Sequence, residues 1–278
     1  MPRIDSHQHF WVFDPVRDSW INDEMRVIQR DFLPADLQPV LADNGIDGCI
    51  AVQADQSEIQ NDFLLGLANG NDFIKGIVGW VDLRADNIAE RLEYYSEVNL
   101  MKGFRHVLQG EQDRALMLKP AFKNGIGQLK KHGFTYDILI FPDQLQYVSE
   151  FAAAFPDQKF VIDHLAKPYI KDGKIDDWGR DMRNLAKHNN LYCKVSGMVT
   201  EADWKNWKAE DFFPYMDVAF EAFGAERLMF GSDWPVCQVA ASYASMKGIV
   251  EQYTTRLSAT EQAAFWGGNA SEFYSLKQ

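Results

Sequence analysis

Two histidines near the start of the chain, His7 and His9, have the spacing of a paired metal or proton-transfer site. They follow a short run, Arg3–Ser6, that we predict to be a β-strand. Side chains two residues apart in a strand point to the same side, so both imidazole rings should face one space. Two neutral imidazoles together suit a divalent metal ion or a polarised water. Such a pair is also common in surface turns, so its meaning depends on its neighbours.

Two more ionisable residues come directly after apolar runs further along the chain. His164 follows Phe160–Asp163, and Asp233 follows Leu228–Ser232. A carboxylate near the two histidines can bind a metal, accept a proton from water, or do both. A single aspartate after a strand is more often a helix cap. Four such residues at the ends of three predicted strands instead favour one shared catalytic site.

Four further residues are candidates for contact with a ligand. Arg105 has a rigid fork of donors that suits a carbonyl, carboxylate or diol, although it could also form a salt bridge at the rim. Gln53 and Trp80 end predicted strands and could supply a hydrogen bond and an apolar platform, with core packing as the alternative for Trp80. Lys194 either lies buried with a carboxylate partner or reaches the substrate.

Eight short apolar runs, rich in β-branched residues, recur roughly every 32 residues, which is the length of one strand, loop and helix. No glycine-rich phosphate loop follows the first run, which disfavours a doubly wound sheet. We therefore predict an α/β fold, a single (β/α)8 TIM barrel domain over residues 1–278. The predicted strands are Arg3–Ser6, Gly48–Val52, Ile74–Trp80, Met101–His106, Thr135–Ile140, Lys159–Asp163, Leu191–Val195 and Arg227–Phe230.

Local signals also predict helix ends and long loops. Asp143 is placed to cap a helix that stops before Pro156, and Ser258–Glu261 has the form of a capping box that opens a terminal helix through Phe273. The connections over residues 10–30 and 197–214 are long and rich in aromatic residues. Both follow predicted strand ends, where barrel enzymes build their sites. Their aromatic side chains either pack the rim or form a lid over a small ligand.

Composition narrows the classes of partner. The chain has 28 Lys and Arg against 40 Asp and Glu, a formal net charge of −12. This acidity argues against nucleic acid and against an anionic membrane as partners. Three widely spaced cysteines without a CxxC pair are typical of a reducing compartment. With no apolar stretch of roughly 18 residues and no signal-peptide pattern, we expect a cytoplasmic protein.

Taken together, six blocks of sequence resemble the amidohydrolase superfamily. Within it the chain is most similar to the branch of sugar-acid lactonases that contains the L-fuconolactonase-like and L-rhamnonolactonase-like proteins, with the 2-pyrone-4,6-dicarboxylate lactonases as relatives. The resemblance runs from position 4 to about 274, and the HQHFW opening and the GSDWPV block are together specific to this branch. The blocks are Ile4–Trp11, Lys102–His106, Asp163–Pro168, Lys194–Gly197, Gly231–Pro235 and Gly268–Ala270.

The resemblance implies a (β/α)8 barrel that hydrolyses a lactone or a similar ester. Residue by residue, His7 and His9 match the histidine pair of the first strand, His164 the histidine of the sixth, and Asp233 the aspartate of the eighth. The predicted fifth strand offers no histidine and the fourth no bridging lysine, which disfavours a two-metal site. A single divalent ion, zinc, held by His7, His9 and Asp233 is implied. Some relatives work without metal, so catalysis without one stays open.

The expected reaction is attack of water on the carbonyl of a sugar lactone of the L-fucono, L-rhamnono or L-galactono type. Asp233 takes the proton of the water and returns it to the ring oxygen, while Arg105, His164 or a metal stabilises the oxyanion. The chain has no GxSxG motif for a serine nucleophile. The alternatives are a metal-dependent decarboxylase of an unsaturated acid and a non-catalytic barrel that binds sugar acids. The exposed aromatic loops also allow a homo-oligomer.

Overall fold

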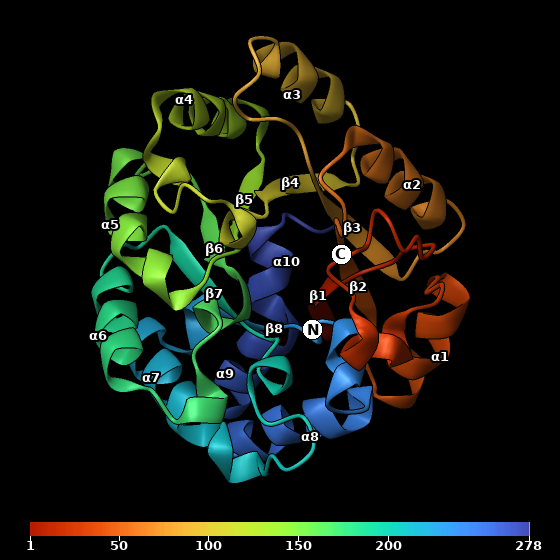
Figure 1. Ribbon diagram of the computed structural model, residues 1–278, viewed down its shortest axis with the longest axis vertical. Coiled ribbons are helices and arrows are strands. Elements are labelled where there is room, and N and C mark those ends of the chain that lie inside the picture. The colour runs from red at the N-terminus through yellow and green to blue at the C-terminus, as the bar shows by residue number, and fades with distance from the viewer. Residues whose placement is uncertain (278) are drawn as a thin grey trace.

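Eight parallel strands form the centre of the computed structural model, which describes residues 1–277 (Figure 1). Each strand pairs with the next one along the chain, in the order β1 to β8. A parallel bridge between Gln8 and Trp234 and a 2.6 Å hydrogen bond from the Ser6 hydroxyl to the Phe230 carbonyl join β8 to β1. The sheet therefore closes into the predicted (β/α)8 barrel. The strands are β1 Ile4–Gln8, β2 Gly48–Val52, β3 Ile74–Gly79, β4 Met101–His106, β5 Thr135–Ile138, β6 Phe160–Ile162, β7 Leu191–Val195 and β8 Leu228–Phe230.

A ring of helices surrounds the strands and buries their outer faces (Figure 1). In α5, for example, Leu145, Val148 and Phe151 are buried at the helical spacing that the sequence indicates. Within residues 1–277, we find no helix whose length and apolar character would let it cross a membrane. The helices are α1 Pro34–Asp43, α2 Glu58–Ala68, α3 Ile88–Ser96, α4 Pro120–Leu129, α5 Leu145–Ala154, α6 Asp176–Leu185, α7 Phe213–Phe223, α8 Tyr243–Thr254, α9 Ala259–Ala263 and α10 Asn269–Phe273.

The inside of the barrel has an apolar end and an ionisable end. Helix α10 lies in the middle of the ring (Figure 1), and its residues close the amino-terminal end of the barrel. The ionisable side chains lie above this plug, towards the carboxyl ends of the strands, where barrel enzymes carry their sites. The buried cluster at the apolar end consists of Ile4, Ile50, Val52, Val78, Val161, Met229, Ala270, Phe273 and Tyr274.

Two predictions of helix ends differ from the structure. Ser258 caps α9 through the predicted capping box, but the terminal helix does not run unbroken to Phe273. It is interrupted at residues 264–268, because Gly267 packs against the Pro2 carbonyl so closely that a Cβ would lie 1.9 Å from that oxygen. Asp143 does not cap α5, since its carboxylate pairs with Arg114 at 2.7 Å.

Candidate active site

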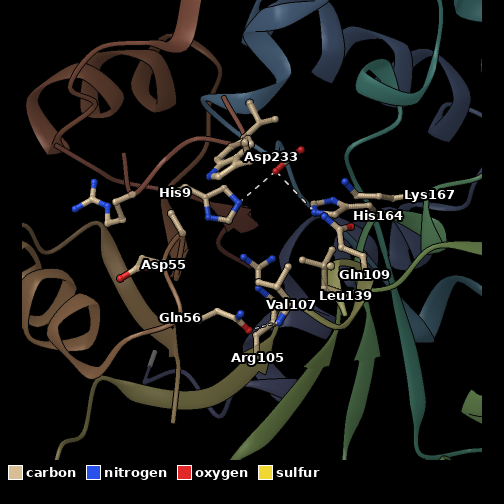
Figure 2. A pocket seen from close by; sticks show the side chains of 15 residues that line it. His9, Asp55, Gln56, Arg105, Val107, Gln109, Leu139, His164, Lys167 and Asp233 are labelled. Carbon is tan, nitrogen blue, oxygen red and sulfur yellow. Dashed lines mark hydrogen bonds and ion pairs between the residues drawn. The ribbon is translucent and has the colours of Figure 1, made fainter. Parts of the chain in front are cut away.

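Four ionisable side chains that the sequence singles out meet at the carboxyl end of the barrel. The Nε2 atoms of His7 and His9 lie 3.2 Å apart, and Asp233 Oδ1 lies 3.3 Å from His9 Nε2. The same oxygen is 3.8 Å from His164 Nε2 and 4.0 Å from His7 Nε2. Figure 2 shows His9 and His164 pointing at Asp233 from opposite sides. Strands β1, β6 and β8 thus bring these residues together, although they are far apart in sequence.

The turn that carries Asp233 is tied to β1 by a residue that sequence reasoning missed. Asp5 Oδ1 accepts hydrogen bonds from the backbone nitrogens of Ser232 (2.8 Å) and His7 (3.1 Å). The Asp233 nitrogen donates to the His7 carbonyl at 2.8 Å. Burial raises the pKa of Asp5 to about 6, against the opposing effect of these hydrogen bonds. Asp5 stands in the same sequence block as His7. This position beside a candidate residue is the signal that could have identified it.

His164 sits in a strained turn after β6. Residues 164–167 have consecutive positive φ angles between 53° and 55°, a conformation that non-glycine residues rarely adopt. Ser196 Oγ lies 2.9 Å from His164 Nδ1, and Gly197 packs so closely that a Cβ would lie 2.6 Å from that nitrogen. Backbone strain of this kind concentrates at functional sites. The cost of the strained turn is offset here by the packing of Ser196 and Gly197 against His164, which fixes the direction of the imidazole ring.

The protonation states follow from burial and from neighbouring groups. Burial lowers the pKa of His7 far below its ordinary value and that of His164 to about 4, which outweighs the nearby carboxylates. Burial alone would raise the pKa of Asp233, but His164, His9 and His7 beside it hold that pKa well below its ordinary value. At neutral pH, Asp233 is therefore an ionised carboxylate, and His7 and His164 are neutral rings.

The hydrogen-bond partners fix the directions of the two imidazole rings. His9 Nδ1 lies 2.8 Å from the Val52 carbonyl, which can only accept, so this nitrogen carries a proton. His7 Nε2 lies 3.2 Å from His9 Nε2 and 3.2 Å from Arg105 Nη1, and His7 Nδ1 lies 3.1 Å from Lys194 Nζ. Donor atoms of His7, His164 and Asp233 lie close enough together to hold one divalent ion. His9 Nε2 lies 3.2 Å from His7 Nε2 and 3.3 Å from Asp233 Oδ1, so the predicted ligands His7, His9 and Asp233 also fit such an ion.

A cavity of about 390 Å³ opens above Asp233 (Figure 2). Its size suits one small molecule, and its wall mixes apolar with polar groups. Trp20 comes from the long loop at residues 10–30, which therefore forms part of the wall. Fifteen described residues line the cavity, none from the loop at 197–214: His9, Arg17, Trp20, Ala54, Asp55, Gln56, Arg105, Val107, Gln109, Gly110, Leu139, His164, Lys167, Asp233 and Val236.

Arg105 lines the cavity, as expected for a residue that contacts ligand. Its Nη1 pairs with Asp163 Oδ2 at 3.1 Å, and its Nη2 donates to the Gln53 carbonyl at 2.5 Å. The salt bridge that the sequence offered as an alternative is thus present as well. It holds the guanidinium at the cavity floor, where the side chain is 4% exposed.

Gln53, Trp80 and Lys194 are not among the residues that line this cavity in the described part of the chain. The Gln53 amide is buried and donates to the Arg105 carbonyl at 3.3 Å. The Trp80 indole donates to His106 Nδ1 at 3.3 Å. Lys194 is fully buried below the site, between carboxylates, which is the other of its two predicted fates.

The polar wall of the cavity holds residues that sequence reasoning passed over. Asp55 and Gln56 follow β2, and Gln109 follows β4. Lys167 ends the strained turn after β6 and lies 3.5 Å from Glu201. Reading three to five residues beyond each strand end would have found all four, because loops at this face point into the site.

Three comparisons with known proteins agree with this geometry. A family model described as Amidohydrolase matches residues 4–276. A protein of Burkholderia multivorans named L-fucono-1,5-lactonase is 42% identical, covering 99% of this chain and 97% of its own length. A protein of the same name from Burkholderia ambifaria is 34% identical, covering 99% and 96%. The crystal structure of an amidohydrolase from Burkholderia multivorans with bound zinc covers 100% of both chains, with a TM-score of 0.97 and 41% identity.

Proposed function

This chain belongs to the amidohydrolase family, and we propose that it is a lactonase that hydrolyses a sugar-acid lactone to the open-chain aldonic acid. The proposed substrates are lactones of the L-fucono, L-rhamnono or L-galactono type. Similarity to two L-fucono-1,5-lactonases over nearly the whole chain supports this substrate class. The observation that carries the reaction type is the ionised Asp233, 3.3 Å from His9 and 3.8 Å from His164 at the floor of a cavity for one small molecule.

In the proposed reaction the lactone carbonyl lies over Arg105 and His164, with a water beside Asp233. Asp233 accepts a proton from the water as the water oxygen bonds to the carbonyl carbon. Arg105, held by Asp163, donates to the developing oxyanion, and His164 lies beside it. The bond between the carbonyl carbon and the ring oxygen then breaks, and Asp233 returns the proton to that oxygen. One carboxylate therefore serves first as base and then as acid.

We propose zinc as the ion at this site, held by His7, His9 and Asp233. The donors are imidazole nitrogens and a carboxylate oxygen, which zinc binds well, and a structure 41% identical to this chain contains zinc. When bound, a divalent ion supplies positive charge that stabilises an oxyanion and lowers the pKa of water. Metal binding requires a neutral imidazole, and burial lowers the pKa of His7 well below its ordinary value.

The cavity wall suits a polyhydroxylated ring. Asp55, Gln56 and Gln109 offer acceptors and donors for ring hydroxyls, while Trp20 and Leu139 offer an apolar wall. The proposal also includes one domain over residues 1–278 that acts in the cytoplasm on a small molecule, without nucleic acid or membrane. The net charge of −12 supports the absence of such anionic partners.

A panel of aldonolactones, screened with a pH indicator, tests the substrate class. Lactone opening releases an acid, so a hit acidifies the solution faster than the buffer blank. We expect L-fucono-1,5-lactone or a lactone of closely related stereochemistry among the hits. Silence across the panel, beside an active lactonase as positive control, would reject the proposed substrates. Release of carbon dioxide from an unsaturated acid would instead identify a decarboxylase.

A further inference from the structure

A second group of charges lies directly beneath the candidate site. Lys194 Nζ is 2.5 Å from Asp137 Oδ2, 3.0 Å from Asp163 Oδ1 and 3.1 Å from His7 Nδ1. The four side chains are fully buried. Burying one cation between two carboxylates costs desolvation energy that apolar side chains of similar volume would avoid. This cost points to a role for the group other than folding stability.

The group is also joined to the C-terminal part of the chain. Tyr274 directly follows α10, whose residues close the amino-terminal end of the barrel (Figure 1). Its hydroxyl lies 2.9 Å and 3.1 Å from the two carboxylate oxygens of Asp137. A phenol donates to a carboxylate, so Tyr274 fixes the rotation of Asp137. Asp137 in turn holds Lys194 in place.

The other side of the group contacts His7. His7 Nδ1 lies 3.2 Å from Asp163 Oδ1, and His7 Nε2 faces the donor Arg105 Nη1. His7 Nδ1 also lies 3.1 Å from Lys194 Nζ, so Lys194 and Asp163 together fix the direction of the ring. Lys194 holds the same Asp163 oxygen at 3.0 Å. The contacts therefore run without a gap from Tyr274 through Asp137, Lys194 and Asp163 to the ring of His7.

We propose that Lys194 and Tyr274 are positioning residues that fix the tautomer and the orientation of His7 through Asp137 and Asp163. A carboxylate that accepts from the second nitrogen of a functional histidine typically sets both properties. Lys194 acts one step behind that carboxylate and Tyr274 three steps behind it. The proposal rests on the proposed function only where lactone hydrolysis is used to read the rate.

Tyr274→Phe removes one oxygen and leaves the buried ring in place, so the protein should keep its melting temperature to within a few degrees. We expect kcat to fall at least about threefold with KM within about twofold. The reason is that the contacts from Tyr274 to His7 orient a reacting group and do not form the cavity wall. Tyr253→Phe is the matched control, since Tyr253 is also buried and its hydroxyl donates to Asp217 at 2.8 Å, away from the site. The control should leave kcat unchanged. Equal rates for both variants would overturn the role of Tyr274.

Lys194→Met alone leaves two buried carboxylates without their cation and destabilises the fold. The double variant Lys194→Met/Asp137→Asn removes one charge of each sign and should recover stability relative to the single variant. We expect its kcat to stay about tenfold to a hundredfold below the parent, the usual cost of losing an orienting partner. Recovery of stability together with at least half of the parental kcat would show that Lys194 matters only for folding.

The tautomer of His7 is a readout that needs no substrate. Nitrogen NMR of isotope-labelled histidine, with the His7 signals assigned by their loss in His7→Gln, should show a single tautomer in the parent. We expect the double variant to show a mixture of tautomers. An unchanged single tautomer in the double variant would overturn the positioning role of Lys194. A parent that shows a single tautomer but opens no lactone would refute the proposed function and leave the positioning role supported.

Discussion

Replacement of Asp233 by asparagine removes the proposed proton acceptor and one proposed metal ligand but keeps the shape of the side chain. The amide keeps the size of the carboxylate and can still hydrogen-bond to His9 Nε2, which lies 3.3 Å from Asp233 Oδ1. His7 and His164 are neutral at pH 7, so the loss of the negative charge breaks no ion pair with them. We therefore expect Asp233→Asn to fold with a free energy of unfolding within about 1 kcal/mol of the parent.

The rate should respond very differently. General acid–base catalysis typically supplies roughly 10²- to 10⁴-fold, and the loss of a metal-binding oxygen adds to the fall. The assay is initial-rate lactone hydrolysis corrected for spontaneous opening, with circular dichroism as a check on folding. Asp217→Asn, at a surface carboxylate paired with Arg256, is the control and should retain parental activity. A folded Asp233→Asn protein with more than about a tenth of parental activity would refute the base role, since an asparagine that only caps a turn substitutes freely.

Three further predictions concern the metal, the pH dependence and the strained turn. Dialysis against a chelator should abolish activity, and added zinc should restore it. His7→Ala should lose both bound metal and turnover. Full activity of protein that elemental analysis shows to be metal-free would contradict the metal site. Burial lowers the pKa of His164 from 6.5 to about 4. Between these pH values the unfolded chain therefore binds more protons than the folded chain. The free energy of unfolding should then fall as the pH is lowered from 6.5 towards 4. Urea unfolding across this range should show a shallower fall for His164→Asn than for the parent, and equal slopes would argue against the lowered pKa. Gly197→Ala should lower stability by about 1–3 kcal/mol and reduce kcat, because φ is +61° and the new methyl would lie 2.6 Å from His164 Nδ1; a variant with parental melting temperature and rate would show that the turn tolerates a side chain.

The positions of the strands were largely predictable, because a parallel strand buried on both faces reads as a short apolar run. Gly48–Val52, Met101–His106 and Leu191–Val195 have the predicted bounds. The fifth strand ends two residues earlier than expected, at Ile138, since the Leu139 carbonyl accepts from the Gln109 nitrogen instead of extending the ladder. Such endings depend on a neighbouring loop, which a local pattern does not contain.

The residues of the candidate site were largely predictable as well, because they lie at or just after the ends of the predicted strands. His7 lies near the end of β1, and His9, His164 and Asp233 follow strand ends, so the topology alone gathers them. The depth of a side chain inside the barrel depends on strand register and shear, which sequence spacing does not give. Lys194 is therefore found below the site, although it has the same strand-end signal as the others. The break at Gly267 depends on contact with Pro2 at the other end of the chain and left no local signal.

Hydrolysis of L-fucono-1,5-lactone in water enriched in heavy oxygen tests the central claim most directly. Attack of water on the lactone carbonyl places the label in the carboxylate of the aldonic acid, and the ring oxygen leaves as an unlabelled hydroxyl. Mass spectrometry of the product, after subtraction of spontaneous hydrolysis, should find one heavy oxygen, located in the carboxyl group, at a rate that depends on Asp233. Label on the sugar hydroxyl, or product formation no faster than in buffer, would contradict the account.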